Sequence, residues 1–166
     1  DKIGSVVVLE NNGQQEFTTR ILLDGIARVT DIEPGDFDGD GDIDLVVGQF
    51  GYDDGKIRWM ENLGGWNFES HDLLELSGTI HTPVGDLDGD GDLDLFISNS
   101  SGSTVWLNDG QGAFSDTGQQ LGDVFPRSAT LGDVDGDGDL DAFVTKYRND
   151  DFVWLNDGHG NFSDSG

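Results

Sequence analysis

The stretch Asp36-Phe37-Asp38-Gly39-Asp40-Gly41-Asp42-Ile43-Asp44 places five carboxylates within nine residues. Two similar stretches follow, and they read Asp86-Leu87-Asp88-Gly89-Asp90-Gly91-Asp92-Leu93-Asp94 and Asp133-Val134-Asp135-Gly136-Asp137-Gly138-Asp139-Leu140-Asp141. We call them acidic loops 1, 2 and 3. Neighbouring carboxylates repel one another strongly at neutral pH. A chain that gathers them three times is therefore expected to place a cation between them.

The donor atoms of the loops indicate Ca²⁺. Aspartates at loop positions 1, 3 and 5 can turn inward in a tight coil, the carbonyl at position 7 can join them, and the aspartate at position 9 closes the shell. Hard oxygen donors suit Ca²⁺ at roughly 2.3 to 2.6 Å, whereas Zn²⁺ favours His or Cys and Mg²⁺ keeps several waters. The chain has no Cys, and none of its three His lies in a loop. We expect about three Ca²⁺ ions, one for each loop.

Glycine at loop position 6 is expected to allow the tight coil of the loop. Gly41, Gly91 and Gly138 stand where the chain must turn sharply and a Cβ would clash. The next residue, an aspartate at position 7, then offers mainly its carbonyl oxygen, and its side chain is left to face solvent.

An EF-hand begins with the same Asp-x-Asp-x-Asp-Gly pattern, but it needs a glutamate at position 12 and a helix on each side. Position 12 is Val47, Ile97 or Val144 in the three loops. The residues after each loop are short runs rich in β-formers. The loops are therefore expected to join strand to strand.

A repeat of blade length runs through the chain. The loops begin at residues 36, 86 and 133, which gives intervals of 50 and 47 residues. Asn-x-Gly turns recur in the same phase at Asn11, Asn62, Asn108 and Asn156, each with Phe six residues later. Asn and Gly tolerate the positive φ that tight hairpins demand. Each unit reads as strand, acidic loop, strand, strand, Asn-x-Gly turn, strand, and four antiparallel strands per ~45 residues is typical of a β-propeller blade.

The middle unit illustrates the expected strands. They cover residues 79–87, 93–99, 103–108 and 113–121. Five apolar side chains are expected to pack between neighbouring blades: Leu95, Ile97, Val105, Leu107 and Phe114. No helix of useful length is expected.

The predicted fold class is all-β, with about three four-stranded blades and a partial one. We assign residues 1–25 to the outer strands of a preceding partial blade, 26–76 to a blade with calcium loop 36–44, and 77–122 to a blade with calcium loop 86–94. Residues 123–166 form a blade with calcium loop 133–141 and an incomplete outer strand. Because a closed ring has four to eight blades, we expect a larger or oligomeric propeller. Further blades would come from the same longer chain or from self-association.

Two motifs in constant order resemble FG-GAP/VCBS repeats of integrin-α-type β-propellers. They are the acidic loop with its following Asp-Leu-x-Val-like strand, and the turn Trp-Leu-Asn-Asp-Gly-x-Gly-x-Phe. The resemblance covers essentially the whole chain, and it implies calcium sites that hold the fold together. The implied calcium ligands are Asp36, Asp38, Asp40, Asp42, Asp44, Asp86, Asp88, Asp90, Asp92, Asp94, Asp133, Asp135, Asp137, Asp139 and Asp141. The family's functions include adhesion, sugar binding and accessory propellers of secreted lyases and phospholipases.

The net charge of the chain limits the kinds of partner that it can bind. The formal net charge of −26 argues against nucleic acid and anionic membrane as partners, and no membrane insertion is expected. Acidic loops of this kind need the millimolar calcium found outside cells, because extracellular modules bind Ca²⁺ with dissociation constants of roughly 10⁻⁴ to 10⁻³ M. A secreted or cell-surface location follows from the calcium chemistry.

The sequence gives little support for a catalytic function. The aspartates are expected to be ionised and metal-bound, and neither a Gly-x-Ser-x-Gly elbow nor a Cys/His pair is present. We therefore expect a non-enzymatic binding or adhesion module for an extracellular glycan or protein ligand. Two alternatives stay open: an accessory propeller segment of a secreted enzyme such as a polysaccharide lyase or phospholipase, and a purely structural spacer.

Aromatic residues divide into two groups. Trp59, Trp106 and Trp154 recur just before the turns, which favours packing between blades, whereas Trp66 lies in one turn only and is the better candidate for an exposed stacking residue. Three residues that follow second strands either contact a ligand at one face of the ring or are merely exposed in loops: Tyr52, Tyr147 and Arg148.

Overall fold

The computed structural model describes residues 4–51, 53–123, 125–147 and 150–166. Tyr52 and Arg148 lie outside the described residues. The described chain contains fifteen strands and no helix, and each strand pairing is antiparallel. None of the described segments is a helix long and apolar enough to span a bilayer.

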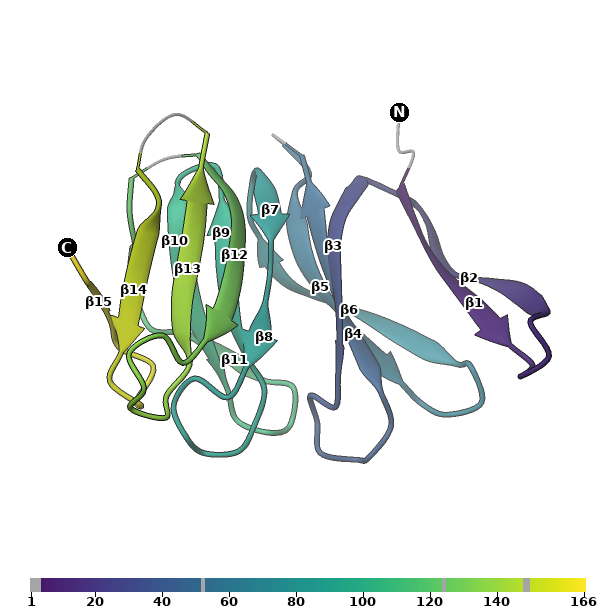
Figure 1. The fold of residues 1–166 in the computed structure, drawn as a ribbon. Coiled ribbons are helices and arrows are strands. Elements are labelled where there is room, and N and C mark those ends of the chain that lie inside the picture. Colours follow the sequence, from purple (N-terminus) through teal and green to yellow (C-terminus); the bar gives the residue numbers. More distant parts are fainter. Residues whose placement is uncertain (1–3, 52, 124, 148–149) are drawn as a thin grey trace.

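Three sheets follow one another along the chain, preceded by a hairpin (Figure 1). The N-terminal hairpin consists of β1 (Gly4–Asn11) and β2 (Phe17–Ile26). Blade 1 consists of β3 (Arg28–Gly35), β4 (Asp44–Phe50), β5 (Lys56–Asn62) and β6 (Phe68–Glu75). Blade 2 consists of β7 (Thr79–His81), β8 (Val84–Gly85), β9 (Asp94–Asn99), β10 (Gly102–Asn108) and β11 (Phe114–Asp116). Blade 3 consists of β12 (Pro126–Gly132), β13 (Asp141–Lys146), β14 (Phe152–Asn156) and β15 (Phe162–Asp164).

This architecture confirms the predicted all-β fold of propeller blades. In each blade the acidic loop joins the first strand to the second, and the Asn-x-Gly turn joins the third to the fourth. Because both connections leave the same ends of the strands, the three acidic loops and the turns gather at the lower end of the sheets in Figure 1.

Two strands of blade 2 differ from the expectation. The inner strand expected over 79–87 is divided into β7 and β8, which both pair with β9, because Pro83 has no N–H to donate between them. The outer strand expected over 113–121 is shortened to β11. It ends where the N–H of Gly118 turns back to the carboxylate of Asp116 at 2.8 Å, with Gly118 at φ +76°.

The apolar core lies between the sheets. Phe37, Val46, Ile57 and Trp59 of blade 1 meet Leu95 and Ile97 of blade 2, and Val105 of blade 2 belongs to the cluster shared with blade 3. Leu107 and Phe114 are partly buried against these clusters. The five side chains predicted to pack between blades therefore do so.

The tryptophans follow the predicted division. Trp59 and Trp154 are buried and Trp106 is half-buried, in agreement with packing between blades. Trp66 is 41% exposed, and the guanidinium carbon of Arg20 lies 5.0 Å from the centroid of its ring.

Candidate metal centres

The carboxylate of the first aspartate in each acidic loop accepts hydrogen bonds from backbone N–H groups later in the same loop. Asp36 accepts the N–H groups of Gly39 and Gly41 at 2.9 and 3.0 Å, and Asp86 accepts the N–H groups of loop positions 4 and 6 at 2.8 and 3.1 Å. Asp133 accepts the N–H of Gly136 at 2.7 Å. The carboxylates at positions 3 and 5 each accept the N–H two residues later, at 2.8 to 3.2 Å. These bonds coil the backbone so that the acidic side chains face one centre.

Glycine permits this coil at two positions, of which sequence reasoning named one. The glycines at position 6 have φ of +93°, +98° and +104°, as the sharp turn requires. The predicted clash was wrong, because a Cβ added at any of the three would meet nothing within 4 Å, so glycine is needed there for its backbone conformation alone. The glycines at position 4 are also left-handed, with φ of +74°, +81° and +87°. Both conformations are costly for residues with a Cβ.

The carboxylates converge in all three loops. One oxygen from each of three aspartates lies within 4.8 Å of the others, and the three groups are Asp36, Asp38 and Asp40; Asp86, Asp88 and Asp90; and Asp133, Asp135 and Asp141. Burial raises the pKa of Asp38 and Asp88, and neighbouring carboxylates raise it further against the opposing hydrogen bond from the backbone. Gathering these negative charges is therefore unfavourable on its own. Three hard oxygens facing one point fit a divalent cation such as Ca²⁺.

The aspartate at position 9 has a structural role that sequence reasoning missed. Asp94 is fully buried, and its two carboxylate oxygens accept the N–H of Leu87 and the N–H of Asn108, both at 2.8 Å. Asp44 and Asp141 are equally buried and bind the equivalent backbone groups of their own blades. Burial raises the pKa of Asp94 to about 6. The position 9 carboxylate thus ties the acidic loop to the turn of the same blade.

The aspartate at position 7 points toward the same turn. A Cβ on Gly110 would clash with the carboxylate of Asp92, and a Cβ on Gly158 would clash with that of Asp139. Both aspartates are half-buried, whereas Asp42 of loop 1 is exposed as expected. In blades 2 and 3 the absence of a Cβ on the turn glycine therefore leaves space for the position 7 aspartate, whose side chain was expected to face solvent.

Acidic loops 1 and 2 also contact the turn of the following blade. The side-chain amide of Asn108 and the N–H of Gly112 donate to the carbonyl oxygen of Phe37 at 2.9 and 3.0 Å. Asn156 and Gly160 make the same bonds to the carbonyl oxygen of Leu87 at 2.8 and 2.9 Å. We call this pair of bonds the loop–turn joint. It connects position 2 of one acidic loop to the next blade.

The fifth turn residue shows why the joint uses glycine. It is left-handed in all four turns, with φ of +66° at Gln15, +69° at Trp66, +75° at Gly112 and +72° at Gly160. A Cβ on Gly112 would clash with the ring of Trp59 in the preceding blade. Only the two turns that form a joint therefore have glycine there.

A fourth group of ligating side chains lies away from the loops. Asp31 and Glu33 of β3 and His81 of β7 are half-buried and bring one ligand atom each to within 4.8 Å of the others. Thr82 donates to Asp31 from its N–H at 2.6 Å, and the N–H of Ala129 in β12 donates to Nδ1 of His81 at 3.4 Å. With Nδ1 accepting, a neutral His81 has its proton on Nε2, which lies 3.6 Å from Asp31. This group therefore connects the first strands of three blades.

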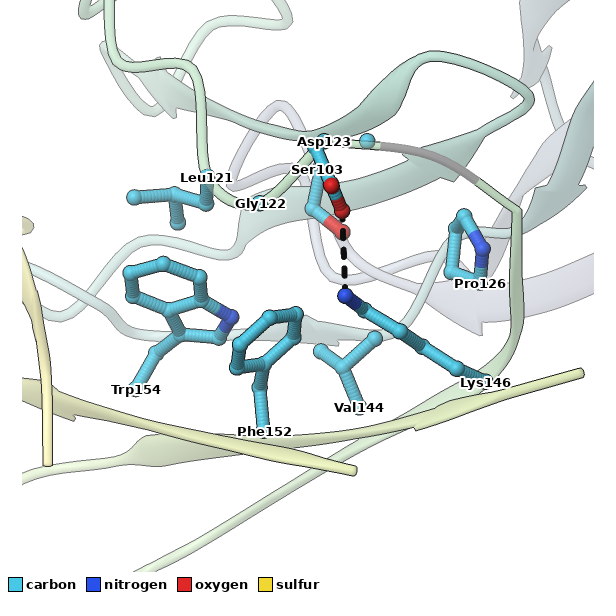
Figure 2. A pocket seen from close by; sticks show the side chains of 10 residues that line it. Ser103, Leu121, Gly122, Asp123, Pro126, Val144, Lys146, Phe152 and Trp154 are labelled. Atoms are coloured by element: carbon cyan, nitrogen blue, oxygen red, sulfur yellow. Dashed lines mark hydrogen bonds and ion pairs between the residues drawn. The ribbon is translucent and has the colours of Figure 1, made fainter. Parts of the chain in front are cut away.

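A small cavity between blade 2 and blade 3 holds no ligand larger than water. Its volume is about 10 Å³, which is room for about one water molecule. Figure 2 shows Lys146 reaching across it to Asp123, with Nζ 3.0 Å from the carboxylate and 3.6 Å from the ring centroid of Phe152. Phe152 and Trp154, whose ring centroids lie 5.4 Å apart, line the same cavity.

Comparison with solved structures shows the same fold in larger proteins. A lectin of Agrocybe aegerita, described as recognising non-reducing terminal N-acetylglucosamine, is 24% identical with a TM-score of 0.64, and the match covers 98% of this chain and 45% of the lectin. The Tc holotoxin pore of Photorhabdus luminescens is 19% identical with a TM-score of 0.52, over 96% of this chain and 8% of the toxin chain. This chain thus spans less than half the length of either. No curated protein matches it.

The sequence profile of the FG-GAP-like repeat matches residues 2–47 and 86–144. These segments include all of acidic loops 1, 2 and 3 and make up more than half of the chain, which confirms the resemblance drawn from the loops and turns. The protein belongs to the FG-GAP-like repeat family.

Proposed function

We propose that the three acidic loops bind Ca²⁺, and that the ions stabilise a non-catalytic binding module that works outside cells or at their surface. One observation carries the proposal: three aspartate oxygens converge within 4.8 Å in each of three loops that are wound by the same hydrogen bonds. Such a group is stable when a cation offsets the repulsion between its carboxylates.

The position of the loops favours a structural role for calcium. Each loop is tied to the turn of its own blade by the buried aspartate at position 9, and loops 1 and 2 are also joined to the next blade through Phe37 and Leu87. An ion that orders a loop would therefore order the contact between two blades. Binding to the folded state alone at a free calcium concentration 100 times the dissociation constant adds about 2.7 kcal/mol per site.

The hydrogen bonding of the loop carboxylates favours a binding role over catalysis. In the loops they accept backbone hydrogen bonds and face one another, which suits a closed metal shell better than acid–base chemistry. The Agrocybe lectin with the same fold is described as recognising a terminal sugar, which supports a glycan as the ligand class for this chain as well. An accessory segment of a secreted enzyme and a structural spacer remain the competing proposals.

Calcium binding can be tested by titrating Ca²⁺ into protein freed of metal with EGTA. Calorimetry should give about three sites, and thermal unfolding should shift to higher temperature with Ca²⁺. The matched control is Asp116→Asn in β11, outside the loops, which should keep full stoichiometry. A melting temperature that is the same in excess EGTA and in saturating Ca²⁺ would contradict structural calcium.

A further inference from the structure

An open pocket of about 340 Å³ lies at the end of the blades opposite the acidic loops. Its lining comes from three successive blades: β3, β7 and β12 at their first residues, and the ends of β4 and β13. In Figure 1 these strand ends lie at the upper end of the sheets. The volume falls within the range of roughly 300 to 1,000 Å³ that is typical of small-molecule sites.

The charge of this pocket is opposite to that of the chain. The protein has 34 acidic and 8 basic residues, yet two arginines, Arg28 and Arg127, line the pocket and none of its described lining residues is acidic. The local potential therefore favours an anion in a molecule that otherwise repels anions.

Among the described residues, neither guanidinium group has a hydrogen-bond or ion-pair partner, and each lies over an aromatic ring. The guanidinium carbon of Arg28 lies 5.8 Å from the ring centroid of Phe50, and that of Arg127 lies 4.3 Å from the ring centroid of Tyr147. Stacking on an aromatic face uses the plane of the guanidinium and leaves its in-plane donors for an acceptor. The ion pairs among the described residues use other cations, namely Arg20, Lys56, Arg58, His71, His81 and Lys146.

Exposed aromatic rings border the same space. Phe125 is 62% exposed and Tyr147 is 58% exposed, and both line the pocket. Phe125 also has a φ of +54°, which is rare for a bulky residue and costs free energy. An aromatic face offers an apolar platform that matches the C–H face of a sugar ring.

We infer that this pocket binds a carboxylated sugar, that is, a uronic-acid residue of an acidic glycan. The carboxylate would accept hydrogen bonds from Arg28 and Arg127, since planar guanidinium groups match carboxylates with two parallel bonds. The ring face would lie on Phe125, which lines the pocket and is 62% exposed. The inference deepens the proposed binding function and rests on it, but it requires no metal ion in the pocket.

The test uses the 166-residue chain in saturating Ca²⁺ and follows backbone amide chemical shifts during titration with methyl glucuronoside. Methyl glucoside is the uncharged control, because it has the same ring without the carboxylate. Methyl glucoside 6-sulfate tests whether a sulfate can replace the carboxylate. The glucuronoside should bind with shifts at the ends of β3 and β12, and the glucoside should not. Arg28→Gln with Arg127→Gln should weaken binding roughly 10- to 100-fold, the loss expected for charge-assisted hydrogen bonds.

Two further variants keep the result interpretable. Arg20→Gln removes a cation on β2 and should leave the affinity unchanged, whereas Arg28→Lys keeps the charge without the planar donors and should give intermediate affinity. Equal binding of the glucoside, tighter binding of the sulfate, full binding by the double variant, or no binding of the glucuronoside would each overturn the inference. Calcium titration of the same sample gives a separate readout, so failure of the pocket is distinguishable from failure of the calcium sites.

Discussion

The side-chain amide of Asn108 in blade 2 donates a hydrogen bond of 2.9 Å to the carbonyl oxygen of Phe37 in blade 1, across 71 positions of sequence. Phe37 is fully buried beneath this contact. Asn156 repeats it on Leu87, whereas the equivalent Val134 in acidic loop 3 is 57% exposed. The Asn-x-Gly turn therefore has two roles: it closes a hairpin within its own blade and contacts the blade before it.

Asn108→Ala should lower the free energy of unfolding by about 1 to 3 kcal/mol, because the buried carbonyl of Phe37 loses one of its two donors. Urea unfolding in saturating Ca²⁺ measures the change. Asn11→Ala is the control, since Asn11 lies in an exposed turn where, within the described part of the chain, its side chain accepts only the N–H of Gly13. Equal losses for the two variants would show that the loop–turn joint adds no stability.

Gly112→Ala should be more destabilising than Gly118→Ala. The two glycines have nearly the same φ, +75° and +76°, so both substitutions cost about 1 to 2 kcal/mol for the left-handed backbone. A Cβ on Gly112 also clashes with the ring of Trp59, whereas a Cβ on Gly118 meets nothing within 4 Å. The difference between the two melting temperatures isolates the contact between blades. If the two variants melt together, Gly112 serves the turn alone.

Asp88→Ala and Asp94→Ala should distinguish the role of binding Ca²⁺ from the role of holding the acidic loop to the turn of the same blade. Asp88 converges with Asp86 and Asp90, so its loss should remove one bound Ca²⁺ while changing the calcium-free protein little. Asp94 is buried between two backbone N–H groups, and its loss should cost the calcium-free protein about 2 to 5 kcal/mol by leaving those donors unpaired. Calorimetric stoichiometry and chelator-treated unfolding curves measure the two effects. The assignment fails if the two variants behave alike in EGTA.

Asp72→Asn should show a pH-dependent loss of stability. The hydrogen bond from Lys56 lowers the pKa of Asp72, and Arg58 lowers it further against the effect of burial. A carboxyl with a lowered folded pKa contributes stability above its unfolded value of about 3.9, and this contribution is lost as the pH falls through the folded pKa. Because the Asp72 side chain is 44% exposed, we expect less than about 1 kcal/mol at pH 7.

The measurement for Asp72 is the difference in melting temperature between wild type and Asp72→Asn across pH. The difference should be largest at neutral pH and shrink toward zero below the folded pKa. Glu69→Gln, on the same strand, should show no such trend. A constant difference across pH would mean that the pair of Asp72 with Lys56 and Arg58 contributes through packing rather than charge.

Local patterns in the sequence were enough to predict the blades. The acidic loops and the Asn-x-Gly turns are held by hydrogen bonds between residues close in sequence, so their positions could be predicted from the sequence. The order of the strands and the burial of Leu95 and Ile97 followed from those positions. The strand break at Pro83 was also a local signal, since proline lacks an N–H, but the expected strand ran through it.

Contacts between blades could not be predicted in the same way. The bond from Asn108 to Phe37 and the shared pocket of Arg28 and Arg127 depend on how one sheet lies against the next, which no local pattern encodes. The tether made by Asp94 lies within its own blade, and it was missed for a different reason: an aspartate that binds a metal ion and an aspartate that accepts backbone N–H groups look alike in the sequence.

The acceptor in each loop–turn joint is a main-chain oxygen, and the donors are one amide side chain and one main-chain N–H. Phe37 and Leu87 can therefore exchange places without changing the contact. This contact between neighbouring blades is therefore independent of which apolar side chain occupies position 2 of the acidic loop, so substitutions there can change the packing of the core while the two hydrogen bonds stay the same.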